Sequence, residues 1–322
     1  ELARIADRHP PELHPRDAFG REEDLIEYHP AYREMEEIAF DAFGLHAMNH
    51  RGGVLDWPSP IGALAKYAAT YLFVQGEFGL MCPISRCDTA AFMVGRYATP
   101  EIRDRYLPRM TAPSCEEMWT GTQFMTERIG GSDVSQLEVE ARLEDGEWHI
   151  YGDKWFCSHT DSAVILILAR SGEKSAGSKG LSLFLVPRWL EDGSRNAYRT
   201  LRLKPKLGTK SMATGEVRFE GAVGYLLGEE GRGLRQTMDH VNLSRLSHGV
   251  RAAAMMRRGL NEALTAARGR TAFNTTLDTH PLMRRQLLKI MLPTEQALSA
   301  FLYSAAVMEK ADNGDDAAAT VL

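Results

Sequence analysis

Apolar and polar positions follow three different periods along the chain, and the first period is helical. In residues 1–118, after an irregular start, apolar side chains recur at i, i+3, i+4, i+7 and i+8, clearest at Leu64, Tyr67, Ala68, Tyr71 and Leu72. Residues 31–43 carry a similar stripe, and Pro100 opens a helix that ends near Pro108. Apart from short loops, this region has no strand pattern. The sequence therefore predicts an N-terminal helical domain.

The middle of the chain has the period of β-strands. Apolar residues alternate with charged ones over 137–143, and the alternation returns after a turn at Gly146, which can take the positive φ that a tight hairpin needs. The apolar runs 164–168 and 183–186 are typical of strands buried on both faces. Residues 120 to about 228 are therefore predicted to form a β domain, a closed or nearly closed antiparallel sheet.

The last part returns to the helical period. Residues 234–268 contain no proline, and a second long helix is predicted over 282–310. Because two long helices cannot enclose a core, we expect their partners in later residues of a longer chain or in neighbouring subunits. The chain starts without methionine and stops inside helix-forming sequence, which favours a fragment. The predicted class is α+β, in three parts: an N-terminal helical domain (1–119), a middle β-barrel domain (120–230) and the truncated start of a C-terminal helical bundle (231–322).

The charge of the chain gives no general reason to expect nucleic acid as a partner. Its 322 residues carry a formal net charge of −5, whereas a protein that lives on phosphate contacts is usually basic. Arg251, Arg257 and Arg258 form a local basic group, for which a solvated helix face is favoured over a binding surface. The most apolar helical segment, 61–74, carries Lys66 and is too short to span a bilayer.

The cysteines indicate neither a disulfide framework nor a metal site. They form no CxxC pair, no histidine pair lies beside them at zinc-ligand spacing, and four are few for a chain this long: Cys82, Cys87, Cys115 and Cys157. We expect no metal, and a reducing, cytoplasmic location.

Two segments of the β region carry candidate chemistry. The segment 123–134 combines hydroxyl side chains with a Gly-Gly turn whose amides can approach a phosphate or the polar edge of a heterocycle, although an ordinary loop reads the same way. On the strand 152–158, Trp155 and Phe156 should point to opposite faces, one into the barrel and one over a flat ligand, with Ser158 on the side of Phe156. A buried aromatic strand is the plain alternative.

Taken in order, these segments resemble the acyl-CoA dehydrogenase family across nearly the whole chain. The resemblance rests on four motifs in register: M-T-E-x-x-G-G-S-D-V at 125–134, G-x-K-W-F-x-S at 152–158, K-L-G-x-K-S at 206–211 with E-V-x-F after it, and R-G-L at 232–234. The first two motifs, with Cys82-Pro83-Ile84, are most similar to the AidB-like (adaptive-response) branch.

The resemblance implies an FAD site at the edge of the β domain. It places Gln123, Met125 and Thr126 against the edge of the isoalloxazine ring and its carbonyl oxygens, Phe156 over the ring, and Ser158 near the flavin N5.

Further residues follow from the same resemblance. Ser132 is expected near the FAD pyrophosphate or an acyl-CoA phosphate, and Arg245 near the substrate channel. Arg270, with Phe273 beside it, is expected to reach the FAD of an adjacent subunit. Asn274 stands where the family usually has glycine.

The implied reaction is α,β-dehydrogenation of an acyl-CoA thioester, with hydride transfer to flavin N5. The family's catalytic glutamate is expected beyond Leu322, and the acyl group is left open. A homotetramer and an electron-transfer flavoprotein are the implied partners, and no membrane is expected. Two alternatives stay open: an AidB-like flavoprotein that binds DNA during alkylation damage, through a C-terminal extension this chain lacks, and a flavin-free remnant.

Overall fold

The computed structural model describes residues 1–321, which divide into two compact units. The first contains residues 1–59 and 79–243, and the second contains residues 60–78 and the chain from 244 onward. The long helix α6 (Gly233–Gly269) begins in the first unit and continues into the second.

The first unit opens with α1 (Leu2–Arg8), a hairpin of β1 (Glu12–Arg16) and β2 (Glu22–Glu27), and α2 (Pro30–Glu37), which continues as the π-helix η1 (Ile38–Ala42). The prediction that this region has no strands is therefore wrong, although its helices are present.

The sequence did not predict this hairpin because one of the two buried positions in β2 is charged. In β2 the buried positions are Asp24 and Ile26, so only one of the two buried residues is apolar, while the apolar Leu25 is exposed. The carboxylate of Asp24 accepts hydrogen bonds from the Thr200 amide (2.9 Å) and the Arg195 guanidinium. A carboxylate with such hydrogen-bond partners can be buried in the core, but it interrupts the alternation of apolar and polar residues from which a strand is predicted.

After the one-turn segment η2 (Val54–Asp56), the first unit continues with α4 (Met81–Tyr97) and α5 (Pro100–Met110). Thr99 caps α5, since its hydroxyl accepts from the Ile102 amide. Helix α4 lies directly on strand β3 (Gly121–Phe124), where a side chain on Gly121 would meet the Ala90 methyl at 2.7 Å.

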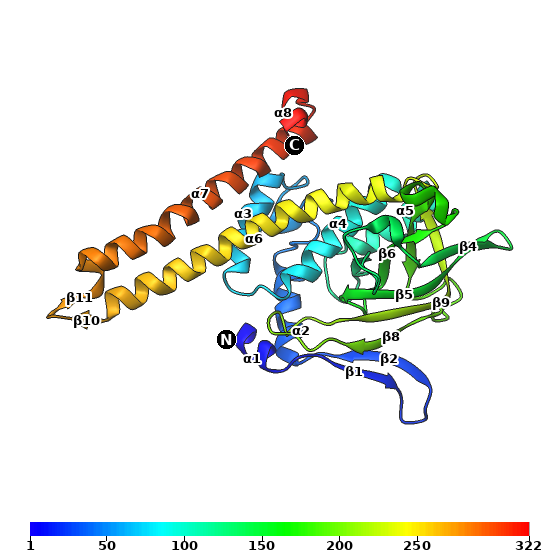
Figure 1. The fold of residues 1–322 in the computed structure, drawn as a ribbon, viewed down its shortest axis with the longest axis horizontal. Helices are drawn as coiled ribbons and strands as arrows, with labels where there is room; N and C mark the ends of the chain where they lie inside the picture. The colour runs from blue at the N-terminus through cyan, green and yellow to red at the C-terminus, as the bar shows by residue number, and fades with distance from the viewer. Residues whose placement is uncertain (322) are drawn as a thin grey trace. The chain divides into compact units, whose positions relative to one another are not determined.

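A closed barrel forms the centre of the first unit (Figure 1). Five strands pair around the ring in the order β6–β4–β5–β9–β7 and back to β6, while β3 adds to β6 and β8 adds to β9. The strands are β3 (Gly121–Phe124), β4 (Glu140–Glu144), β5 (Glu147–Ser158), β6 (Val164–Arg170), β7 (Leu181–Pro187), β8 (Tyr198–Leu203) and β9 (Thr214–Leu227), with short 3-10 segments η3 (Val134–Gln136) and η4 (Lys174–Gly180) between them.

The barrel confirms the predicted β domain, but the prediction that its strands are all antiparallel is wrong. All residues of β6 and β7 are buried, as their apolar runs predicted. Asp145 and Gly146 make the predicted tight turn, both with positive φ. The sheet is not wholly antiparallel, because β3 and β4 both run parallel to β6.

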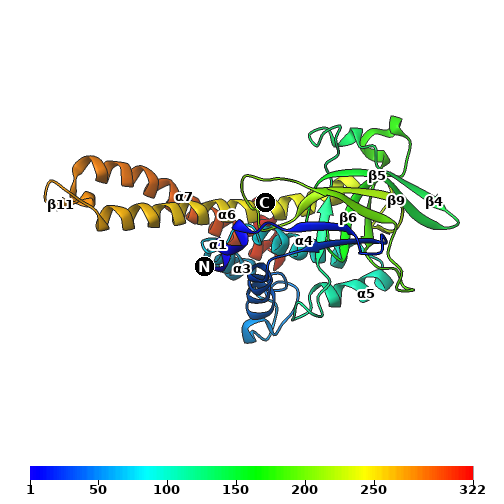
Figure 2. The same cartoon turned by 90° about the horizontal axis from the view of Figure 1, so that it is seen from below.

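The second unit contains α3 (Ala63–Val74), most of α6, and α7 (Pro281–Asp312), followed by α8 (Asp316–Val321). Figures 1 and 2 both show α7 running back beside α6 after the small hairpin of β10 (Thr271–Ala272) and β11 (Thr275–Thr276), which η5 (Leu277–Thr279) joins to α7. The two predicted long helices are thus present.

Two details of the second unit differ from prediction. In α3 the buried face contains Tyr67 and Tyr71 as expected, but Leu64 and Leu72 are exposed and Lys66 is buried instead. Arg251 was interpreted as part of a solvated helix face in preference to a binding surface, yet its side chain is buried and donates to the Ser247 carbonyl (3.3 Å). No helix within residues 1–321 is both long and apolar enough to cross a membrane.

Candidate functional site

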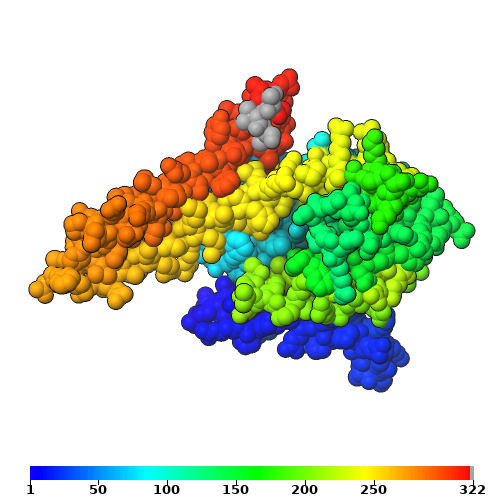
Figure 3. All heavy atoms as spheres, in the orientation of Figure 1, coloured from blue at the N-terminus to red at the C-terminus, as the bar shows by residue number. Residues whose placement is uncertain are grey.

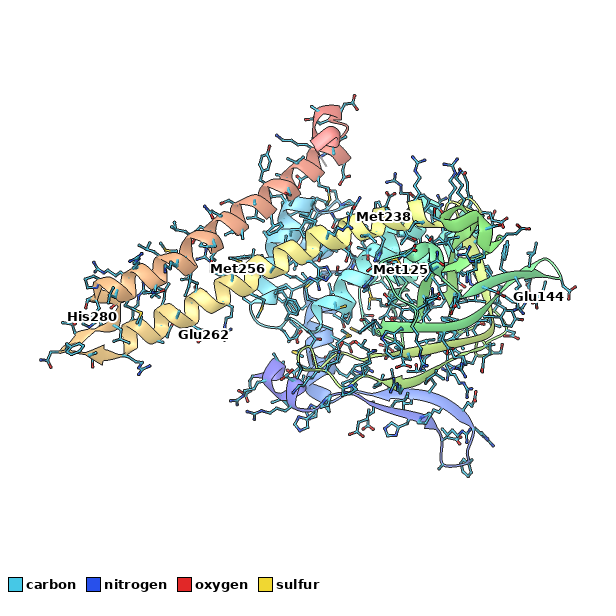
Figure 4. The ribbon with its side chains drawn as sticks, in the orientation of Figure 1. Met125, Glu144, Met238, Met256, Glu262 and His280 are labelled. Carbon is cyan, nitrogen blue, oxygen red and sulfur yellow. The ribbon has the colours of Figure 1, made fainter. Side chains whose placement is uncertain are left out.

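The predicted flavin-edge residues begin at the end of β3, where Gln123 is buried. Its side chain is 5% exposed, and neither its amide oxygen nor its amide nitrogen has a hydrogen-bond partner within the described chain. Gln123 and Met125 alternate with Phe124, which points into the barrel core. Figure 4 shows Met125 well away from Glu144, which lies next to the turn of the β4–β5 hairpin. A buried donor and acceptor without partners fit a ligand with a polar edge.

The loop after β3 is held in place by a buried ion pair. Lys154 Nζ lies 2.6 Å from Glu127 Oε1, with the two side chains 0% and 4% exposed, and it also donates to the Met125 carbonyl (3.1 Å). The Glu127 carboxylate accepts further from the amides of Glu138 (2.6 Å) and Val139 (3.2 Å). Burial lowers the Lys154 pKa, and the Glu127 charge opposes that shift. One pair thus joins β5, the loop and the approach to β4.

A backbone bond completes the connection between loop and strand. The Trp155 amide donates to the Thr126 carbonyl (2.8 Å), and Glu127 and Gly130 exchange backbone bonds around the turn, with Gly130 at φ +135°. The segment that carries Thr126 is therefore fixed relative to the strand that carries Phe156 and Ser158.

Neither Lys154 nor Glu127 was assigned a role from the sequence. A signal was available, because Ile150, Gly152 and Lys154 share the inward face of β5 by alternation. A lysine on the inward face needs a buried carboxylate as its partner. In the sequence, Glu127 is suggested as that partner only by its position in the loop motif.

Trp155 and Phe156 do not point to opposite faces as predicted. A β-bulge interrupts β5 between Lys154 and Cys157, and Phe156 adopts a φ of +56°. The extra residue shifts the alternation, so that Cys157 enters the barrel core and both aromatic rings stay outside it. Lys204 Nζ lies 3.8 Å from the centre of the Trp155 ring and 3.9 Å from that of Phe156.

The bulge leaves Phe156 60% exposed, which is unusual for a large aromatic residue on a barrel strand. Ser158 is partly buried, and its backbone carbonyl accepts from the Thr122 hydroxyl (2.8 Å). Phe156 thus presents an exposed ring next to Trp155, whose amide bonds the Thr126 carbonyl, an arrangement that can cover a flat ligand.

Ser132 lies at the surface, in the turn that leads to η3. Its neighbour Asp133 caps this segment by accepting from the Ser135 amide (3.1 Å). The contact of Ser132 with a phosphate therefore stays a prediction.

The remaining predicted residues belong to the second unit. Arg245 and Arg270 are exposed, and Phe273 is 92% exposed at the turn of the β10–β11 hairpin. Phe273 and Asn274 both have positive φ, +49° and +63°, the conformation of a two-residue hairpin turn. Asparagine tolerates this conformation well, so Asn274 forms the turn although the family usually has glycine at this position. Figure 4 shows His280 beside this hairpin, and its Nε2 lies 3.1 Å from the Ala272 carbonyl.

The structure thus brings together five of the predicted residues in the first unit: Gln123, Met125, Thr126, Phe156 and Ser158. Across residues 1–321 no group of three or more histidine, cysteine or acidic side chains is placed to hold a metal, and the four cysteines are free. The five residues brought together carry amide, thioether, hydroxyl and aromatic side chains.

Three family models match consecutive parts of the chain. Residues 1–116 match the N-terminal domain of the adaptive response protein AidB, residues 122–222 the middle domain of acyl-CoA dehydrogenases, and residues 231–322 their C-terminal domain. The chain is 37% identical to AidB of Escherichia coli strain K12 over 305 residues, which cover 92% of this chain and 54% of the relative. It spans about half the length of the curated relatives it matches first.

Solved structures agree with these matches. The Caenorhabditis elegans protein ACDH-11, solved in complex with C11-CoA, superposes with a TM-score of 0.88 at 28% identity, covering 99% of this chain and 55% of that one. Butyryl-CoA dehydrogenase of Megasphaera elsdenii has the same fold, with a TM-score of 0.77 at 19% identity over 88% of this chain and 72% of that one. The chain belongs to the acyl-CoA dehydrogenase family, with an N-terminal part of the AidB type.

Proposed function

We propose that this chain builds the flavin edge of an FAD-dependent acyl-CoA dehydrogenase-type oxidoreductase. The observation that carries the proposal is the buried side chain of Gln123, whose amide donor and acceptor are both without partners beside a loop fixed by the Lys154–Glu127 pair. The polar edge of a flavin ring offers a complementary N–H and carbonyl oxygens. FAD, when bound, would supply the acceptor for a hydride from the acyl-CoA β-carbon.

The residues of the chain have separate roles in this proposal. Gln123, Met125 and Thr126 hold the ring edge, Phe156 covers one ring face and excludes water from it, and the Ser158 hydroxyl binds near N5. The bulge at Phe156 supports this division, because it frees the ring from the barrel core.

The second unit would complete the cofactor and substrate sites. We propose that Arg270 and Phe273 reach the FAD of a neighbouring subunit, with Arg245 at the substrate channel and Ser132 at a phosphate. Exposed apolar side chains along α7 support assembly into a homotetramer: Leu282, Leu288, Ile290 and Leu292. A cytoplasmic location, an acyl-CoA substrate, electron transfer to a flavoprotein and the three-domain division at residues 119 and 230 belong to the same proposal.

Reconstitution with FAD tests the function directly. In the intact protein, Gln123→Leu should weaken FAD binding at least tenfold, because the ring edge loses both hydrogen bonds. Gln136→Leu, at an exposed glutamine of η3, is the matched control and should bind FAD normally. Flavin absorbance after gel filtration measures both. A colourless intact protein that takes up no FAD, or equal binding by the two variants, would overturn the proposal.

A further inference from the structure

A cavity of about 410 Å³ opens in the first unit between the N-terminal segment and the chain around β8 and β9. Pro10 and Pro11 form one wall, and residues 203–214 form the other. Figure 3 shows the blue atoms of the first residues against the yellow-green atoms of this later segment. Gln123 does not line this cavity, and the proposed function uses none of the residues that do, although Lys204 in its wall lies over the Phe156 ring.

Three lysines line this cavity, and no acidic residue does. Within residues 1–321, none of the ammonium groups of Lys204, Lys206 and Lys210 forms an ion pair with a carboxylate. The neighbouring arginines differ, because Arg128 and Arg202 both pair with Glu216, at 3.1 Å and 2.6 Å. Three unpaired like charges around one cavity repel one another, and an anion between them removes that cost.

Two of the lysines are already held in position. Lys206 is half-buried and donates to the Met212 carbonyl and to the Thr214 hydroxyl (3.1 Å). Lys204 lies over the rings of Trp155 and Phe156. Because these groups are ordered before any ligand arrives, binding an anion would cost little side-chain entropy. Burial lowers the Lys206 pKa to about 8, which is the shift expected of a cation lacking a counter-ion.

We infer that this cavity is a binding site for a small phosphate-bearing molecule, held by Lys204, Lys206 and Lys210. Phosphate suits the site because ammonium groups bind it as point charges from several directions, without the planar fork that carboxylates favour. The walls of Pro10, Pro11 and Met212 are apolar, so the ligand carries an uncharged part next to its phosphate.

Calorimetry on the apo protein at low ionic strength tests this site without any flavin. The probes are inorganic phosphate, pyrophosphate and coenzyme A, which separate binding of the anion alone from binding that also uses the apolar wall. Saturable binding of at least one probe is expected, and the double variant Lys206→Met/Lys210→Gln should weaken it at least tenfold. Lys174→Gln, at an exposed lysine of η4, should leave it unchanged.

Tryptophan fluorescence provides a second readout, since an anion that draws Lys204 off the Trp155 ring changes the environment of that indole. The spectrum should shift with the same saturation as the heat. Absence of saturable binding by every probe would overturn the site, as would equal weakening by Lys174→Gln. Competition by FAD would overturn it too, because the cavity would then be part of the cofactor site. Loss of flavin binding alone would count against the proposed function and leave this site standing.

Discussion

The two regions that carry predicted cofactor residues are built in opposite ways. In the first unit, the Thr126 loop is fixed by the buried Lys154–Glu127 pair and by the Trp155 amide. In the second unit, Arg270 and Phe273 lie at an exposed two-residue hairpin whose strands are two residues long.

The difference teaches which part of the site is complete within one chain. Buried polar groups with their partners in the same unit keep their geometry without help. Arg270 and Phe273, by contrast, are exposed, and the Phe273 ring meets the His280 ring edge-on at 6.0 Å, so we expect them to add little to the stability of their own chain. We therefore expect loss of the buried ion pair in the first region to alter folding, and changes in the second region to alter binding alone.

The largest effect is expected from Lys154→Met. The change leaves the Glu127 charge buried without a cation, and the free energy of unfolding should fall by about 3–5 kcal/mol. Urea unfolding followed by circular dichroism measures this. Lys154→Met/Glu127→Leu should recover much of the loss, because both charges are then gone. A single variant as stable as wild type would show that the pair does not hold the loop.

Acid should weaken the first unit through His46. This side chain is buried, its Nε2 lies 3.2 Å from the Ala112 carbonyl, and burial lowers its pKa from 6.5 to about 4. Between pH 6.5 and pH 4, His46 is protonated in the unfolded chain but remains neutral in the folded chain. The free energy of unfolding therefore decreases as the pH falls from 6.5 toward 4.

The matched variant is His46→Gln, which keeps a donor but does not titrate. Between pH 7 and pH 5, wild type should lose about 2 kcal/mol more unfolding free energy than the variant, from 1.36 kcal/mol per pKa unit. Parallel pH profiles for the two proteins would mean that His46 is protonated as easily in the folded state as in the unfolded one.

Arg270→Glu should separate binding from folding. Unfolding free energy should change by less than about 0.5 kcal/mol, because the side chain is exposed. FAD affinity of the intact protein should fall at least tenfold, since an anion replaces a cation expected near two phosphates. Arg268→Glu, also exposed in the last turn of α6, is the control. Normal FAD affinity in Arg270→Glu would remove the second region from the cofactor site.

The sequence predicted the elements whose burial follows a simple period. The all-buried strands β6 and β7 and the long helices α6 and α7 appear as their apolar patterns indicated. The β1–β2 hairpin was missed because Asp24 occupies an inward position that the pattern reads as surface. A period in hydrophobicity records burial only where the buried residue is apolar.

The candidate site was predictable in its residues but not in its geometry. Motifs identified Thr126, Phe156 and Ser158, yet the bulge that turns Phe156 out of the barrel has no signature in the letters around it. The Lys154–Glu127 pair joins residues 27 positions apart, and only the closed barrel brings them within 2.6 Å. Long-range pairing of this kind depends on strand register, which alternation restricts but does not specify.

Ser158→Ala is expected to have the smallest effect, and it tests whether a residue of the first region can act on flavin binding without acting on folding. Folding should not change, because the hydrogen bond from the Thr122 hydroxyl goes to the backbone carbonyl of Ser158, and alanine keeps that carbonyl. The hydroxyl is then available to the flavin, and its loss should weaken FAD binding by about 1 kcal/mol and shift the flavin absorbance bands. Ser175→Ala, at an exposed serine of η4, should match wild type in every respect. An unaltered spectrum and affinity in Ser158→Ala would leave Ser158 as a strand residue, held in the first region for structure alone.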